Sequence, residues 1–166
     1  MSEKRSAISI GEGLTIVANL GLVIGLMFVW LELRQSQTQL EAEVELNIAS
    51  SYQTALGRMV DNPEIADVMI AAYSNPESLT PTQYLQLTSY HAEWMVLVFA
   101  TYQVWRSGAV EDEVWDQHST YYMLFLQTPW MQEFWRSLNH DDLYPRQFIE
   151  ELEARLPEPQ TFSIPD

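Results

Sequence analysis

The chain of 166 residues contains no cysteine. This absence excludes disulfide bridges, thiolate zinc sites, iron–sulfur clusters and a cysteine nucleophile. Glycine is scarce as well, with six residues, of which three lie between Gly13 and Gly25. A Walker loop, a Gly-x-Gly-x-x-Gly loop and a Gly-x-Ser-x-Gly turn are all missing, so the sequence carries none of these nucleotide-binding or hydrolase motifs.

Basic residues are few, and lysine is missing from most of the chain. Eight Lys and Arg residues stand against 23 acidic residues, which gives a formal net charge of −15. All of this excess lies in residues 35–166, which contain five arginines, no lysine and 20 acids. Phosphate contacts require clustered basic side chains, so we expect no nucleic-acid binding. The same deficit argues against docking on an anionic lipid surface.

Charge is absent altogether between Glu12 and Glu32, so that residues 13–31 form an apolar run. A helix of this length would extend roughly 28 Å, close to the thickness of the bilayer's hydrocarbon core. We expect a transmembrane helix that acts as an uncleaved signal anchor, with Trp30, Glu32 and Arg34 at the membrane interface. A buried core helix and a cleaved signal peptide are the two alternatives.

Small residues lie on one face of this expected span. Ala18, Gly21 and Gly25 share a helical face, and Asn19 lies nearby. Small residues allow a second helix to approach closely, and an asparagine can form hydrogen bonds across the contact. This face therefore predicts helix packing in the membrane, with either another membrane protein or a second copy of the chain.

The orientation rests on few charges. Lys4 and Arg5 precede the span, whereas Arg34 alone follows it closely. Basic residues favour the cytoplasmic side. We therefore expect a single-pass protein of the bacterial inner membrane, with its N-terminus inside and its helical domain in the periplasm.

Proline and glycine divide the remaining chain into helices, and no strand pattern competes. Residues 1–12 form an N-terminal flank, 13–31 the transmembrane helix, 32–156 an acidic helical domain and 157–166 a proline-containing tail, expected to be extended and solvent-exposed. The expected fold is all-α, a long N-terminal transmembrane helix that continues into a small helical bundle. The expected helices after the span run to residue 59 and then over 63–73, 81–107, 111–128, 129–138 and 145–156.

Two apolar stripes are expected to face one another in the bundle core. The first contains Leu87, His91, Trp94, Val98, Thr101 and Trp105, and the second Val114, His118, Tyr121 and Phe125. Aromatic residues are abundant for so small a domain, so part of this surface could dock a partner or line a pocket. Trp94, Trp105 and Tyr121 are the candidates for that role.

The three histidines do not indicate a metal centre. His91 and His118 are expected roughly 13 Å apart along adjacent helices, too far to share a metal. His140 stands beside Asp141 and Asp142, where a metal could bind, although a polar loop with helix-capping acids explains the group as well. We predict no metal, no cofactor and no catalytic residue.

Several segments, in order and spacing, resemble a family of proteins. They are LELRQSQTQLEAE (31–43), DNPEIADVM (61–69), LTPTQYLQL (79–87), YQVWRSGAVEDEVW (102–115) and TPWMQEFWR (128–136). The chain resembles an uncharacterised family of bacterial single-span membrane proteins with a C-terminal helical domain. The resemblance implies architecture and membrane topology, but no activity and no site residue. Trp130 departs from the pattern, since family members tend to have a small residue, often glycine, after the Thr-Pro.

The sequence favours a non-enzymatic protein anchored in the membrane. Its helical domain would bind a partner protein or serve as an accessory subunit of a larger membrane complex. The alternative is a membrane-tethered sensor or enzyme with a ligand pocket in the bundle, because tryptophan and tyrosine often line such clefts.

Overall fold

The computed structural model describes residues 10–138 and 140–160. Within these residues the chain is all-α, with no β-strand. It divides into two compact units, Met1–Glu43 and Val44–Asp166. The sequence places the start of the helical domain at residue 32, whereas the second compact unit begins 12 residues later, at Val44.

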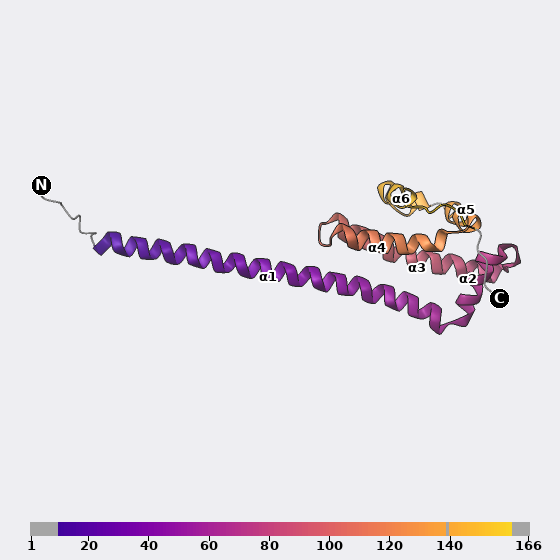
Figure 1. The fold of residues 1–166 in the computed structure, drawn as a ribbon, viewed down its shortest axis with the longest axis horizontal. Helices are drawn as coiled ribbons and strands as arrows, with labels where there is room; N and C mark the ends of the chain where they lie inside the picture. The colour runs from indigo at the N-terminus through magenta and orange to yellow at the C-terminus, as the bar shows by residue number, and fades with distance from the viewer. Residues whose placement is uncertain (1–9, 139, 161–166) are drawn as a thin grey trace, which may run out of the picture. The chain divides into compact units, whose positions relative to one another are not determined.

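The first helix, α1 (Ile10–Asp61), is a single unbroken element (Figure 1). It contains an 18-residue window with a mean hydropathy of 2.3, none of which is buried within the structure. By length and composition this helix could cross a membrane. Asn62 ends it and caps the next helix, since its side chain accepts a hydrogen bond from the backbone N–H of Glu64 at 3.1 Å.

The second unit continues from Val44 through a series of shorter helices. These are α2 (Pro63–Ser74), η1 (Pro76–Ser78), α3 (Pro81–Arg106), α4 (Asp112–Met123), η2 (Leu124–Leu126), α5 (Pro129–Ser137), η3 (His140–Asp142) and α6 (Arg146–Glu153). Three of the α-helices carry proline in their first turn, where the missing N–H costs nothing.

Capping residues fix where the helices begin. Thr80 and Gln83 form a complete capping box at α3, in which each side chain bonds the other residue's backbone N–H. Thr128 caps α5 by accepting from the N–H of Met131 at 3.2 Å. The helix expected to begin at residue 129 therefore forms, although Trp130 departs from the family pattern. Trp130 lies in α5 and stacks on Phe134.

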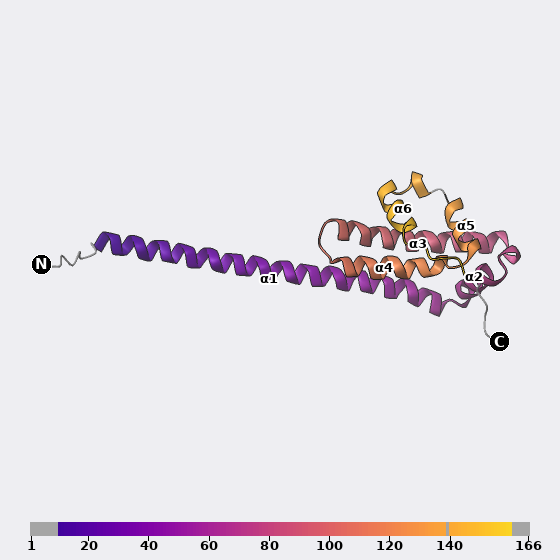
Figure 2. The same ribbon diagram turned by 45° about the horizontal axis from the view of Figure 1, so that its top comes forward.

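Helices α3 and α4 lie side by side and form the centre of the second unit (Figure 2). Gly108 lies just after the C-cap of α3 with φ of 75°, a left-handed conformation that glycine adopts at low cost. Helix α2 packs on α3 and α5. Helix α6 reaches α3 through Phe148, whose ring lies 5.0 Å from that of Phe99.

The buried face of α4 differs from the expected one by a single position. Its buried residues are Trp115, Ser119, Tyr122 and Met123. The predicted stripe, Val114, His118, Tyr121 and Phe125, is instead half-buried or exposed. Part of it faces α1, because the ring of His118 lies 4.1 Å from that of Tyr52. Helix α4 therefore contacts two neighbours, and the stripe read from the sequence is only one of its two faces.

The chain after α6 is hydrogen-bonded to the rest of the second unit. Residues 157–160 are extended, but the Pro157 carbonyl accepts a hydrogen bond of 2.8 Å from the buried side chain of Gln132. The N–H of Gln160 donates to the carbonyl of Gln127 at 2.7 Å. The prediction of a solvent-exposed tail is therefore wrong for its first residue, Pro157, which is half-buried. Residues 161–166 lie outside the described part.

Candidate docking groove and buried polar cluster

The small-residue face expected in the membrane span is open. Ala18, Asn19, Gly21 and Gly25 are all exposed on α1. A Cβ added at Gly21 or Gly25 would meet nothing within 4 Å. The part of the chain that the structure describes thus leaves this face uncovered.

The three residues expected at the membrane interface are also exposed on α1. The guanidinium carbon of Arg34 lies 5.4 Å from the centre of the Trp30 ring, one helical turn away. This is a cation–π contact. Glu32 is exposed between them.

The three pocket or docking candidates are placed in three different environments. Trp94 is fully buried, with 1% of its surface exposed. Trp105 is half-buried, stacks on Trp115 and donates from its indole nitrogen to Asp112 at 2.8 Å. Tyr121 is 37% exposed and stacks on Trp94 with ring centres 6.0 Å apart. The structure brings Tyr121 and Trp94 into contact, whereas Trp105 stacks on Trp115 instead.

An open groove lies between α1 and α3. The two helices run antiparallel there, since Tyr52 contacts Thr101 at 3.5 Å and Arg58 pairs with Glu93. The groove has a volume of about 290 Å³ and is mostly apolar. Its lining residues are Val44, Asn47, Ile48, Ser51 and Tyr52 from α1, with Leu97, Ala100, Thr101 and Val104 from α3.

A second groove lies on the other side of α1, towards α4, with a volume of about 210 Å³. Tyr121 and His118 from α4 line it. Burial lowers the pKa of His118 from its ordinary value, which favours the neutral ring at neutral pH. Tyr52 lines this groove as well as the first one, so its side chain separates the two.

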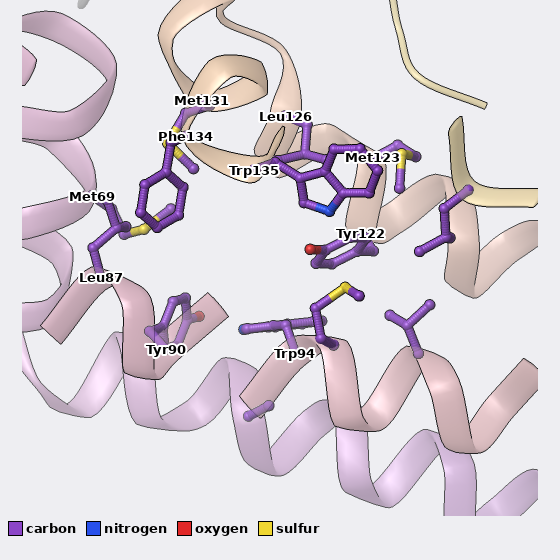
Figure 3. Close-up of a cluster of buried hydrophobic side chains, with 14 of the residues drawn as sticks. Met69, Leu87, Tyr90, Trp94, Tyr122, Met123, Leu126, Met131, Phe134 and Trp135 are labelled. Atoms are coloured by element: carbon purple, nitrogen blue, oxygen red, sulfur yellow. The ribbon is translucent and has the colours of Figure 1, made fainter. Parts of the chain in front are cut away.

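A buried polar cluster occupies the core between α3, α4, α5 and η3. We define it as Tyr90, His91, Trp94, Tyr122, Trp135 and His140. The ring of His91 lies 5.3 Å from the ring of His140, and Tyr122 Oη lies 3.1 Å from each ring nitrogen of His91. Figure 3 shows the Trp135 indole nitrogen turned towards the Tyr122 hydroxyl.

Burial decides the charge state of this cluster. Desolvation, with a smaller contribution from His140, lowers the pKa of His91 from 6.5 to about 3. Burial also raises the pKa of Tyr122 well above its ordinary value. Both side chains are therefore neutral at neutral pH, which is the form that a low-dielectric core tolerates.

Sequence spacing did not reveal the contact between His91 and His140. The two residues are 49 positions apart, and His140 stood in an expected polar loop rather than in the core. The structure instead buries His140 beside Trp135, with ring centres 5.0 Å apart.

The hypothesis of a metal at the His140 loop receives no support. Among the residues that the structure describes, no group of three His, Cys, Asp or Glu residues could hold a metal ion. Asn139 and the side chain of Asp141 fall outside that part.

A small cavity adjoins the polar cluster. Its volume is about 10 Å³, and it is lined by Tyr90, His91, Trp94 and Tyr122 together with apolar side chains. A cavity needs about 10–15 Å³ to hold one water molecule. This cavity is therefore too small for a metabolite.

Comparisons of the chain with protein-family models, with curated proteins and with solved structures found no match.

Proposed function

We propose that this chain is a single-span, membrane-anchored helical protein of the bacterial inner membrane that acts without catalysis, by binding another protein. In this proposal residues 13–31 cross the bilayer with the N-terminus inside. The acidic helical domain that follows forms a small bundle in the periplasm. The uncharged run supports the span, as does the 18-residue window of α1 with a mean hydropathy of 2.3. Lys4 and Arg5 support the orientation.

The groove between α1 and α3 is the observation that carries the proposed interaction. Val44, Asn47, Ile48 and Ser51 follow one another at spacings of three, one and three residues, and the lining of α3 repeats this pattern. Between Val44 and Ser51 the α1 wall rises by about 10 Å, or two helical turns. Ser51 and Ala100 are small, so the backbone of a guest helix could approach closely. A short amphipathic helix fits this shape.

Charge defines the kind of helix that would bind. Residues 35–166 carry 20 acids, five arginines and no lysine. A second copy would bring the same excess of negative charge and be repelled, whereas a basic segment would be attracted. We therefore assign the groove to an amphipathic helix of another protein, with lysine or arginine on the flanks of its apolar face.

Site-specific photo-crosslinking in native membranes tests this assignment. A crosslinking residue is placed at Ala100, which is exposed and lines the groove, or at Ala92, which is exposed on α3 outside it. We expect Ala100, but not Ala92, to label a helical segment of a different protein flanked by basic residues. The A100W variant should lose the partner, whereas A92W should retain it.

Two results would overturn the assignment. One is equal labelling from both positions, which would show contact without use of the groove. The other is labelling from Ala100 of only a second copy of the chain, or of lipid.

The alternative function, a ligand pocket inside the bundle, is less well supported. The cavity beside Trp94 measures about 10 Å³. It lacks room for the drug-sized or cofactor-sized molecules that typical ligand pockets enclose.

A further inference from the structure

Two of the buried polar atoms that have no hydrogen-bond partner among the described residues belong to neighbouring residues of the polar cluster on α3. They are the Tyr90 hydroxyl oxygen and the Trp94 indole nitrogen. Tyr90 is 7% exposed and Trp94 1% exposed, so bulk water does not solvate these atoms. Burial of such atoms without partners is costly, and native proteins usually satisfy them.

The two atoms lie near each other and beside the small cavity. Figure 3 shows the Tyr90 hydroxyl turned towards Trp94, and both residues line the cavity. Burial raises the pKa of Tyr90, and the nearby Trp94 side chain offsets part of that rise. The two side chains are therefore close enough for a hydrogen-bonding influence, although neither atom has a partner that meets hydrogen-bond geometry. A separation of this kind is where a bridging water is expected.

We propose that the cavity between α3 and α4 is a binding site for one water molecule. Its volume of about 10 Å³ matches one water and excludes larger ligands. The indole N–H of Trp94 can only donate, so it donates to the water oxygen, and the Tyr90 hydroxyl takes a second bond. His91 and Tyr122, which also line the cavity, provide the remaining polar contacts.

This site is independent of the proposed docking function, because none of its polar residues lines the groove between α1 and α3. The bound water would connect the members of the buried polar cluster through hydrogen bonds. The water links Tyr90 and Trp94 of α3 to the hydrogen-bonded pair His91–Tyr122, so that polar groups of α3 and α4 satisfy one another inside the core.

Water–protein magnetisation transfer by NMR tests the proposal on the full-length chain in detergent, with tryptophan labelled by ¹⁵N. A long-lived bound water gives a cross-peak to the Trp94 indole proton. Trp115 is the matched control, since its indole nitrogen is also buried without a partner in the described part but does not line the cavity. We expect a water cross-peak at Trp94 and none at Trp115.

The Tyr90→Phe variant removes one anchor of the water and preserves the ring. We expect it to abolish the Trp94 cross-peak and to shift the Trp94 indole resonance, while the Trp115 resonance stays in place. An absent cross-peak at Trp94, equal cross-peaks at both tryptophans, or an unchanged Trp94 cross-peak in Tyr90→Phe would overturn the proposal. A crystal structure with Tyr90 bonded directly to Trp94 would do the same.

Discussion

The hydroxyl of Tyr122 lies 3.1 Å from a ring nitrogen of His91, and both side chains are buried among aromatic residues. A neutral histidine can accept this hydrogen bond, whereas a protonated histidine only donates. The pair therefore places a titratable group in the core. Protonation of His91 in acid removes the acceptor of this hydrogen bond.

The free energy of unfolding should depend on pH through His91. Its pKa is about 3 in the folded chain, against 6.5 for an exposed histidine. Between these values the unfolded chain binds a proton that the folded chain does not, so stability falls as the pH drops from 6.5 towards 3. The loss attributable to this residue should be on the order of a few kcal/mol.

Urea unfolding of the wild type and His91→Gln at pH 7 and pH 4.5 measures this effect. The variant should lose less stability than the wild type over that interval, because glutamine does not titrate. The half-buried His118, changed to Gln, is the control and should alter the pH dependence less. Equal pH dependence in the wild type and His91→Gln would contradict the prediction.

Gln132 should hold the chain after α6 in place. Its side-chain amide donates to the carbonyls of Leu126 at 3.0 Å and Pro157 at 2.8 Å. Gln132→Ala should lower the free energy of unfolding by about 1–3 kcal/mol, since buried carbonyls lose their donor. Hydrogen exchange at the Gln160 amide should accelerate as well. Gln103→Ala, at an exposed position on α3, should leave both quantities unchanged.

Two glycine substitutions should have opposite effects on stability. Gly108 has φ of 75°, so Gly108→Ala should destabilise the fold by about 1 kcal/mol. Gly57 lies inside helix α1, and an added Cβ there would meet nothing within 4 Å. Gly57→Ala should therefore stabilise the helix by about 0.5–1 kcal/mol. Thermal unfolding of both variants tests the pair, and a shift of the same sign in both would refute this account.

Membrane anchoring by residues 13–31 can be tested with one added charge. An arginine at the centre of a membrane helix costs about 2.5–3.5 kcal/mol in insertion. Leu22→Arg should therefore move a measurable fraction of the protein into the soluble fraction after alkaline extraction. Leu46→Arg replaces an equally exposed leucine of α1 outside the span and should leave the protein in the membrane. Extraction of both variants to the same extent would argue against this span.

Local signals made most helix boundaries predictable. The sequence places the start of a helix at Pro81, and the structure contains a capping box of Thr80 and Gln83 there. Pro63 and Pro129 likewise begin helices where the sequence places them. Each of these signals acts within four residues along the chain, so no knowledge of tertiary packing is needed.

Contacts between distant residues could not be read from the sequence. The burial of His140 against His91 depends on how η3 folds back over α3, and the anchoring of Pro157 depends on Gln132 25 residues earlier. Periodicity also cannot say which of two apolar faces of α4 turns inward when both have neighbours. The all-α class was therefore predictable, whereas the polar cluster and the groove depend on tertiary packing.

Tyr52 gives the two grooves beside α1 a common wall. Its ring contacts Trp94 and His118, and its hydroxyl lies near Thr101. A change in the position of this one side chain would therefore alter the lining of both grooves at once.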